Sequence, residues 1–139
     1  MGPENGAKQK LPKDDKISFV SGDILEYCLK ISSVEVVTST YALHHLTTDE
    51  KHILLSALGQ NLPINGLVVI GDLMFKDQST RDKILSGYLS EGKVDLVRDI
   101  EAEYYWDVLE ALRYMAELGL HVTSEQTGEL SWVLTAQKL

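Results

Sequence analysis

Two adjacent histidines, His44 and His45, are the residues best suited to acid–base chemistry. An imidazole titrates near neutrality, so either side chain could accept a proton from a bound substrate. Tyr41 lies three residues earlier and is the third catalytic candidate. The alternative for one histidine of such a pair is a place in the core or a solvated position in a loop. We predict that His44, His45 and Tyr41 shape the reactive part of a site.

A metal site is the second chemistry that this region could support. Asp49 and His52 follow the two histidines and would lie one helical turn apart. A tetrahedral zinc site usually takes Cys or His ligands at defined spacings from two segments. Thr47 interrupts the helical register between the two groups. The sequence therefore favours no metal.

Three short apolar segments carry polar residues at their carboxyl ends. Residues 17–20, 34–39 and 67–70 are rich in β-branched or apolar side chains, which is typical of buried strands. Ligands of open α/β sheets bind beyond the carboxyl ends of parallel strands. The residues at these ends are Ser21-Gly22-Asp23, Ser39-Thr40-Tyr41 and Gly71-Asp72.

Helical patterns lie between and after these strands. Thr47 and Glu50 are spaced as a capping box, which predicts a helix that ends before Pro63. The polar stretch 76–102 predicts short helices, with Ser79 or Thr80 as a cap and Gly87 and Gly92 as interruptions. A stronger apolar stripe predicts a helix over 104–118. A hairpin is expected at the end, with strands at 120–125 and 130–136. This order predicts an α/β fold of parallel strands with an antiparallel edge.

Size and charge narrow the classes of protein. A chain of 139 residues suggests one domain, here 16–139, after a flexible segment at 1–15. The net charge of −8, with no basic face, argues against nucleic acid as a partner. The longest apolar run, at 67–70, is far too short to cross a membrane. With a single cysteine and no recognisable leader, a cytoplasmic protein is expected.

Three segments, taken in order, form a recognisable pattern. Gly22-Asp23 follows a short strand, residues 34–46 (VEVVTSTYALHHL) join a strand to an LHHL loop, and residues 65–72 (NGLVVIGD) join a turn to a second strand. The tail, with Glu103-Tyr104-Tyr105 and a closing hairpin, completes it. Together these segments resemble the C-terminal two-thirds of class I S-adenosylmethionine-dependent methyltransferases that act on small molecules.

The resemblance implies a partial Rossmann-like sheet with helices on its faces, S-adenosylmethionine as cofactor and a small-molecule methyl acceptor. It places Asp23, with Ile24, near the adenine, and Ser39 and Thr40 near the methionine part of the cofactor. His44 or His45 would shape the acceptor site or act as a base. Tyr104 and Tyr105 would close the acceptor pocket. The alternatives are a turn residue for Asp23, loop capping for Thr40 and core packing for the tyrosines.

One departure from the family weakens the expected cofactor binding. These enzymes open with a GxGxG turn against the cofactor and an acid for its ribose, but no two glycines here are separated by a single residue. The chain therefore looks like a fragment that binds S-adenosylmethionine weakly or not at all. The alternative function is a non-catalytic remnant that binds a partner or a second copy. A homo-oligomer through the exposed edge of strand 34–39 is expected in either case.

Overall fold

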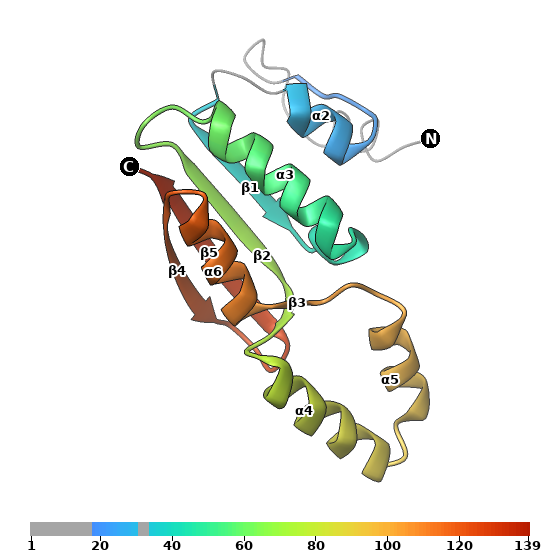
Figure 1. The fold of residues 1–139 in the computed structure, drawn as a ribbon. Coiled ribbons are helices and arrows are strands. Elements are labelled where there is room, and N and C mark those ends of the chain that lie inside the picture. Colours follow the sequence, from blue (N-terminus) through green and yellow to red (C-terminus); the bar gives the residue numbers. More distant parts are fainter. Residues whose placement is uncertain (1–17, 31–33) are drawn as a thin grey trace.

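A mixed sheet organises the part of the chain that the computed structural model describes, residues 18–30 and 34–139 (Figure 1). Its strands in chain order are β1 (Val36–Thr40), β2 (Leu67–Phe75), β3 (Trp106–Asp107), β4 (Leu120–Gln126) and β5 (Ser131–Lys138). The order across the sheet is β1-β2-β5-β4, and β3 pairs with the end of β2. β1 and β2 are parallel, whereas β5 is antiparallel to both β2 and β4. The predicted α/β class with a closing antiparallel hairpin is confirmed.

The strand predicted at 17–20 is wrong for residues 18–20, and Ile17 lies outside the described residues. Residues 18–20 form no strand, and the chain turns at Gly22 into a helix. A short apolar run becomes a strand only where a neighbouring strand satisfies its backbone. Within the described residues, the outer edge of β1 has no such neighbour. The flexible segment predicted at 1–15 also lies outside the described residues.

In the described part of the chain, six helical elements precede or connect the strands. They are α2 (Ile24–Lys30), the 3-10 turn η1 (Leu43–His45), α3 (Thr48–Asn61), α4 (Gln78–Ser90), α5 (Val94–Glu101) and α6 (Val108–Glu117). The predicted capping box of α3 is confirmed, because the Thr47 side chain accepts from Glu50 N at 3.2 Å and the Glu50 carboxylate accepts from Thr47 N at 3.0 Å. No described helix is both long and apolar enough to span a membrane.

Two helix boundaries differ from the prediction. The side chain of Asp77, rather than Ser79 or Thr80, caps α4 by accepting from Thr80 N at 2.7 Å, and α4 continues through Gly87. The helix predicted at 104–118 begins only at Val108. Its expected first turn is lost because Trp106 and Asp107 pair with the end of β2. This extended segment brings residues 103–105 to the carboxyl end of the sheet.

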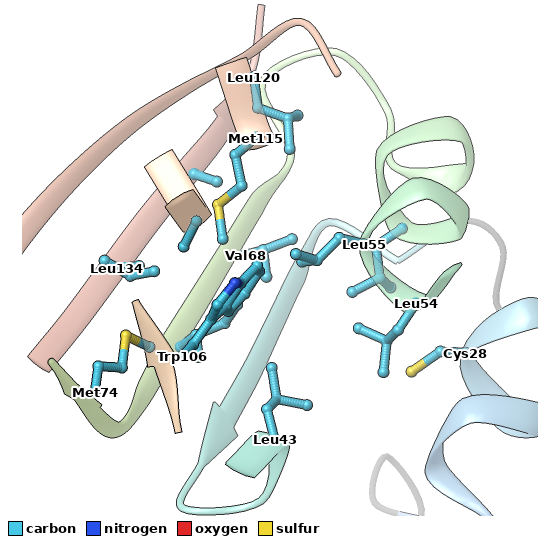
Figure 2. Close-up of a cluster of buried hydrophobic side chains, with 14 of the residues drawn as sticks. Cys28, Leu43, Leu54, Leu55, Val68, Met74, Trp106, Met115, Leu120 and Leu134 are labelled. Carbon is cyan, nitrogen blue, oxygen red and sulfur yellow. The ribbon is translucent and has the colours of Figure 1, made fainter. Parts of the chain in front are cut away.

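The main core lies between the sheet and two helices, α3 and α6, on the same face (Figure 1). Figure 2 shows Leu54 and Leu55 of α3 and Met115 of α6 near Val68 and Trp106. Alternate residues of β2 point into this core, as strand geometry requires. The buried residues of the cluster include Leu43, Leu58, Leu62, Ile70, Met74, Ala111, Leu134 and Ala136.

Candidate active site at the carboxyl ends of β1 and β2

Asp72, near the end of β2, organises the loop that carries the histidines. Its side chain is only 2% exposed, so its charge requires partners inside the protein. One carboxylate oxygen accepts from Leu43 N at 2.8 Å and from His44 N at 3.2 Å. The other accepts from Leu73 N at 2.8 Å and lies 2.7 Å from Nδ1 of His44. A buried anion thereby fixes η1 against the end of the sheet.

His44 is the predicted catalytic residue with the best-defined environment. Its side chain is 11% exposed, and the contact with Asp72 sets its orientation. Because an ionised carboxylate can only accept, Nδ1 carries the proton in this contact and Nε2 is left as an acceptor when the ring is neutral. The edge of the Tyr105 ring lies against His44 with centroids 6.0 Å apart. This is the arrangement that a general base needs.

Tyr105 lies beside His44, and its role in an acceptor pocket stays a prediction. Its ring also packs against Phe75, with centroids 5.6 Å apart. Burial, assisted by the nearby carboxylates of Glu103 and Asp72, raises the pKa of the Tyr105 hydroxyl. Tyr105 is therefore a neutral hydroxyl and an apolar wall near neutral pH. The side chain of Tyr104 is exposed, and its backbone N–H donates to the carbonyl of His44 at 2.7 Å.

Lys51 joins the histidine loop to the segment before β3. It is a fully buried lysine of α3, and its ammonium donates to the carbonyl of Leu46 at 2.8 Å and to the carbonyl of Tyr104. The ammonium also lies 5.9 Å from the centre of the Trp106 ring. Desolvation lowers the pKa of Lys51 to about 8, although the charge of Asp72 opposes this shift. Lys51 therefore holds two carbonyls of distant segments together at the site.

His45 lies on the solvent side of the same loop. Its Nδ1 is 3.0 Å from a carboxylate oxygen of Glu103, and its ring centre is 4.1 Å from that of His44. The side chain of His45 is 62% exposed, so it belongs to the rim of the site rather than to the core. The predicted pair of histidines is thus divided between a buried member and an exposed one.

Tyr41 marks the sharp end of β1. Its φ angle of 53° lies in the left-handed region, which is costly for a residue with a large side chain. Its backbone N–H donates to the carbonyl of Gly71 at 2.8 Å, which ties the turn to β2. Its side chain is largely exposed, and no hydrogen bond or ring contact within the described residues joins it to His44 or His45. A catalytic role for Tyr41 stays a prediction.

The predicted cofactor residues fall into two groups. Ile24 and Ser39 line one cavity of about 280 Å³ between α2, β1 and α3, together with Tyr27. Thr40 is the last residue of β1 and faces a separate hollow of about 290 Å³, which Ser39 also borders. Asp23 is exposed and caps α2, since its side chain accepts from Glu26 N at 3.1 Å. It also borders a more open hollow that shares Ile24 and Tyr27 with the first cavity.

Three residues of the site were not assigned a role from the sequence: Asp72, Lys51 and Glu103. Asp72 is an acid within an otherwise apolar strand, and Lys51 lies one turn before the buried Leu54 and Leu55 of α3. In both cases a charged residue occupies a position that the apolar pattern predicts to be buried. Such a position could have indicated a role in the site from the sequence alone. Glu103 reaches His45 across 58 positions of sequence, and no local pattern could indicate that contact.

Curated proteins with related sequences are methyltransferases of undefined activity. Proteins named "uncharacterized methyltransferase" from Bacillus cereus and Bacillus thuringiensis are 35% identical over 132 residues, which is 95% of this chain. The matched region is 61% of each relative, so the chain spans about three-fifths of their length. No protein-family model matches the sequence.

Solved structures of similar fold are also methyltransferases. An O-methyltransferase family protein from Burkholderia thailandensis has a TM-score of 0.66 at 13% identity, over 87% of this chain and 35% of that one. Human N-acetylserotonin methyltransferase, solved with S-adenosylmethionine, has a TM-score of 0.66 at 16% identity, over 97% of this chain and 37% of that one. At such identities the likeness establishes the fold. Together, the relatives and the fold confirm the resemblance to class I methyltransferases.

Proposed function

We propose that this chain acts as part of an S-adenosylmethionine-dependent methyltransferase whose acceptor is a small molecule. The observation that carries the proposal is the buried Asp72–His44 pair at the carboxyl ends of two parallel strands. The related sequences and the solved methyltransferases of the same fold support the reaction class. One of those structures, named PigF, was solved with the demethylated cofactor, S-adenosylhomocysteine, and has a TM-score of 0.60.

In the proposed reaction His44 accepts the proton that the methyl acceptor loses. Asp72 orients the ring through Nδ1, so Nε2 is the basic atom, and the carboxylate stabilises the imidazolium that forms. When bound, the cofactor supplies an electrophilic methyl group on a sulfonium. The protein then contributes alignment and a base, and the half-buried Tyr105 limits the access of water to His44.

The cavity between α2 and β1 is compatible with a nucleoside-like ligand. Ser39 presents a buried hydroxyl oxygen without a hydrogen-bond partner in the protein, and Ser39 lines the same cavity as Ile24 and Tyr27. An unsatisfied buried hydroxyl costs free energy that a polar ligand atom would recover. The apolar side chains of Ile24 and Tyr27 suit a flat aromatic ring. These features support S-adenosylmethionine at this position.

Binding of S-adenosylmethionine by this chain alone should nevertheless be weak. The resembling family holds the cofactor at a glycine turn, at an acid on the ribose and at an acid near the adenine, and only Asp23 has a match here. A lost charge-assisted hydrogen bond costs about 1.5–3 kcal/mol, which is one to two orders of magnitude in affinity. Calorimetric titration with S-adenosylmethionine and S-adenosylhomocysteine should therefore give weak heats or none. Micromolar binding that Asp23→Ala abolishes would show that the missing motif is dispensable.

The role of His44 is tested by turnover. The full chain is incubated with labelled S-adenosylmethionine and a panel of small hydroxyl, amine and thiol acceptors, and transfer of the labelled methyl group to each acceptor is measured. Where transfer occurs, His44→Ala should lower the rate by about 10²- to 10⁴-fold, the usual contribution of a general base. His121→Ala, an exposed histidine of β4, is the matched control and should leave the rate unchanged. Equal rates in both variants would show that His44 is not the base of the reaction.

Self-association is a second candidate function, favoured by the open edge of β1. Within the described residues no strand pairs with the outer side of β1, and Val36 on this strand is 53% exposed. Unpaired strand edges with apolar side chains are templates for pairing with another chain. We expect an oligomer in sedimentation experiments at micromolar concentration.

Val36→Lys should shift this oligomer towards monomer, because a lysine on an edge strand opposes pairing. Ile53→Lys is the matched control, since Ile53 is 49% exposed on α3, which is not part of the sheet. A wild-type chain that sediments as a monomer would refute the second candidate and leave the first untouched.

A further inference from the structure

We propose that His44, His45 and Glu103 form a binding site for a divalent transition-metal ion with the preferences of Zn²⁺. Each of these side chains offers a ligand atom within 4.8 Å of the other two, and no other such group is found among the described residues. The sequence argued against a metal because zinc ligands usually come at defined spacings from two segments, and Thr47 interrupts the helical register between the histidines and Asp49. The fold supplies Glu103 instead, from a segment almost sixty residues away.

The buried carboxylate of Asp72 prepares His44 as a ligand. Nδ1 of His44 lies 2.7 Å from Asp72, so Nε2 is the nitrogen that remains to bind an ion. A metal-binding histidine almost always donates its other ring N–H to a carboxylate, a carbonyl or water, which fixes the ring and raises its basicity. The buried Asp72–His44 contact therefore gives His44 the orientation and the tautomer that a metal ligand needs.

His45 and Glu103 complete the set from the rim. Nδ1 of His45 and a carboxylate oxygen of Glu103 are 3.0 Å apart, close to the separation of about 3.4 Å between two ligands of a tetrahedral zinc ion. Both side chains are at least one-third exposed, so they can rotate to reach the ion together with Nε2 of His44. Three protein ligands would leave a fourth position for water or for a small ligand.

The two segments that carry the ligands are fixed to each other without a metal. The N–H of Tyr104 donates to the carbonyl of His44 at 2.7 Å, and Lys51 bonds the carbonyls of Leu46 and Tyr104. These hydrogen bonds order the loop without a bound ion. Two imidazoles and a carboxylate suit Zn²⁺ and similar ions, whereas Mg²⁺ and Ca²⁺ prefer sets of oxygen ligands.

The inference goes beyond the proposed function and does not depend on it. A bound ion would occupy Nε2 of His44, the same atom that would serve as the proton acceptor. Metal binding and base catalysis by His44 are therefore mutually exclusive in one molecule. For this reason the test measures binding of the metal alone and uses no turnover assay.

The experiment is a titration of the tag-free full chain with Zn²⁺ by calorimetry, and with Co²⁺ by visible absorption, which reports tetrahedral coordination. We expect one ion per chain, and at least tenfold weaker binding in His45→Ala and in Glu103→Gln. Both changes are at exposed or half-exposed side chains, so the fold should be kept, as circular dichroism would verify. His121→Ala is the matched control and should bind as the wild type does.

Asp72 should position His44 for metal binding, and a variant of Asp72 tests this role. Asp72→Asn should weaken Zn²⁺ binding by about 10- to 100-fold, the usual effect of removing a carboxylate that supports a ligand. The proposal is overturned if the wild-type chain binds no Zn²⁺ at 100-fold molar excess. It is also overturned if His45→Ala and Glu103→Gln bind as tightly as the wild type, because the ion would then lie elsewhere on the surface.

Discussion

The two faces of the sheet carry similar side chains but have different surroundings. On one face Val68, Ile70 and Met74 of β2 are fully buried under α3 and α6. On the other face Leu67, Val69 and Leu73 alternate with them and are only half-buried. Among the described residues no helix packs on these three side chains, and the β1 residues paired with Leu67 and Val69 are exposed. Phe75, which alternation places on the same face at the end of β2, is buried against α4 and α5.

This difference shows how far the sequence of an apolar strand predicts which of its faces are covered. A strand that is apolar at every position is typical of a parallel sheet covered on both faces. Apart from Gly71 and Asp72, β2 has such a sequence, yet the described helices cover its second face only at Phe75. The composition of β2 thus suits burial on both faces, and the described helices bury one face along the strand and the other only at Phe75. The one polar side chain of β2, that of Asp72, lies on the covered face.

Asp72→Ala should cause the largest loss in the free energy of unfolding. The change leaves three backbone N–H groups and Nδ1 of His44 without their acceptor on the covered face. Each unsatisfied buried group costs about 1–3 kcal/mol, and partial access of water reduces the sum, so we expect a loss of about 3–5 kcal/mol in the free energy of unfolding. Urea denaturation measures this loss. Thr38→Ala on the open face is the matched control and should change stability by less than about 0.5 kcal/mol.

The next largest effect on stability should come from Lys51, a buried charged residue of α3, the helix that covers this face. Its pKa is about 8 in the folded chain and near 10.5 when unfolded. Between these values the unfolded chain binds a proton that the folded chain lacks, so the Lys51 contribution to stability should rise with pH, by up to about 3 kcal/mol. In Lys51→Met this rise should disappear.

The measurement is the free energy of unfolding of wild type and Lys51→Met, from pH 7 to pH 10.5. The raised pKa of the buried Cys28 thiol acts in the opposite direction, but it is common to both proteins and cancels in their difference. Lys83→Met, at an exposed position of α4, should follow the wild type. A difference between wild type and Lys51→Met that does not change with pH would mean that Lys51 titrates normally.

Neighbouring valines of β2 give the most direct comparison of the two faces. Val68→Ala and Val69→Ala remove the same two methyl groups from adjacent residues that point to opposite faces. Val68→Ala should cost about 1.5–3 kcal/mol, because it loses buried contacts and leaves a cavity. Val69→Ala should cost less than about 1 kcal/mol. Equal losses in urea denaturation would show that the second face is also covered, for example by a second copy of the chain.

The sequence predicted the elements whose partners are close along the chain. The capping box at Thr47, the apolar strand at the start of β2 and the closing hairpin depend on local spacing, and all three are present. The pattern of residues 18–20 also favoured a strand, but strand formation depends on distant segments, and these residues form no strand. The first turn of the predicted helix at Tyr104 was likewise lost to pairing with β2.

The candidate site was predicted in its residue types but not in its contacts. His44 and His45 were recognised from the LHHL pattern, and Tyr105 from its place in the tail. Their different roles depend on Asp72 and Glu103, which lie 28 and 58 positions away from the histidines they contact. Because such contacts are set by the topology of the sheet, spacing along the chain cannot show which histidine is buried and which is exposed.

The smallest effect should come from the start of α3, the helix that covers β1 and β2. Thr47→Ala removes the acceptor for Glu50 N and should cost about 1 kcal/mol in the free energy of unfolding, a typical value for an N-cap. Thr48→Ala, one residue later and exposed, keeps the capping box and should change stability by a few tenths of a kcal/mol at most. Because α3 covers only one face, Thr47→Ala should leave the urea-measured cost of Val69→Ala unchanged in the double variant, as expected for independent sites. A coupling above about 0.5 kcal/mol between the two changes would mean that the open face depends on α3 after all.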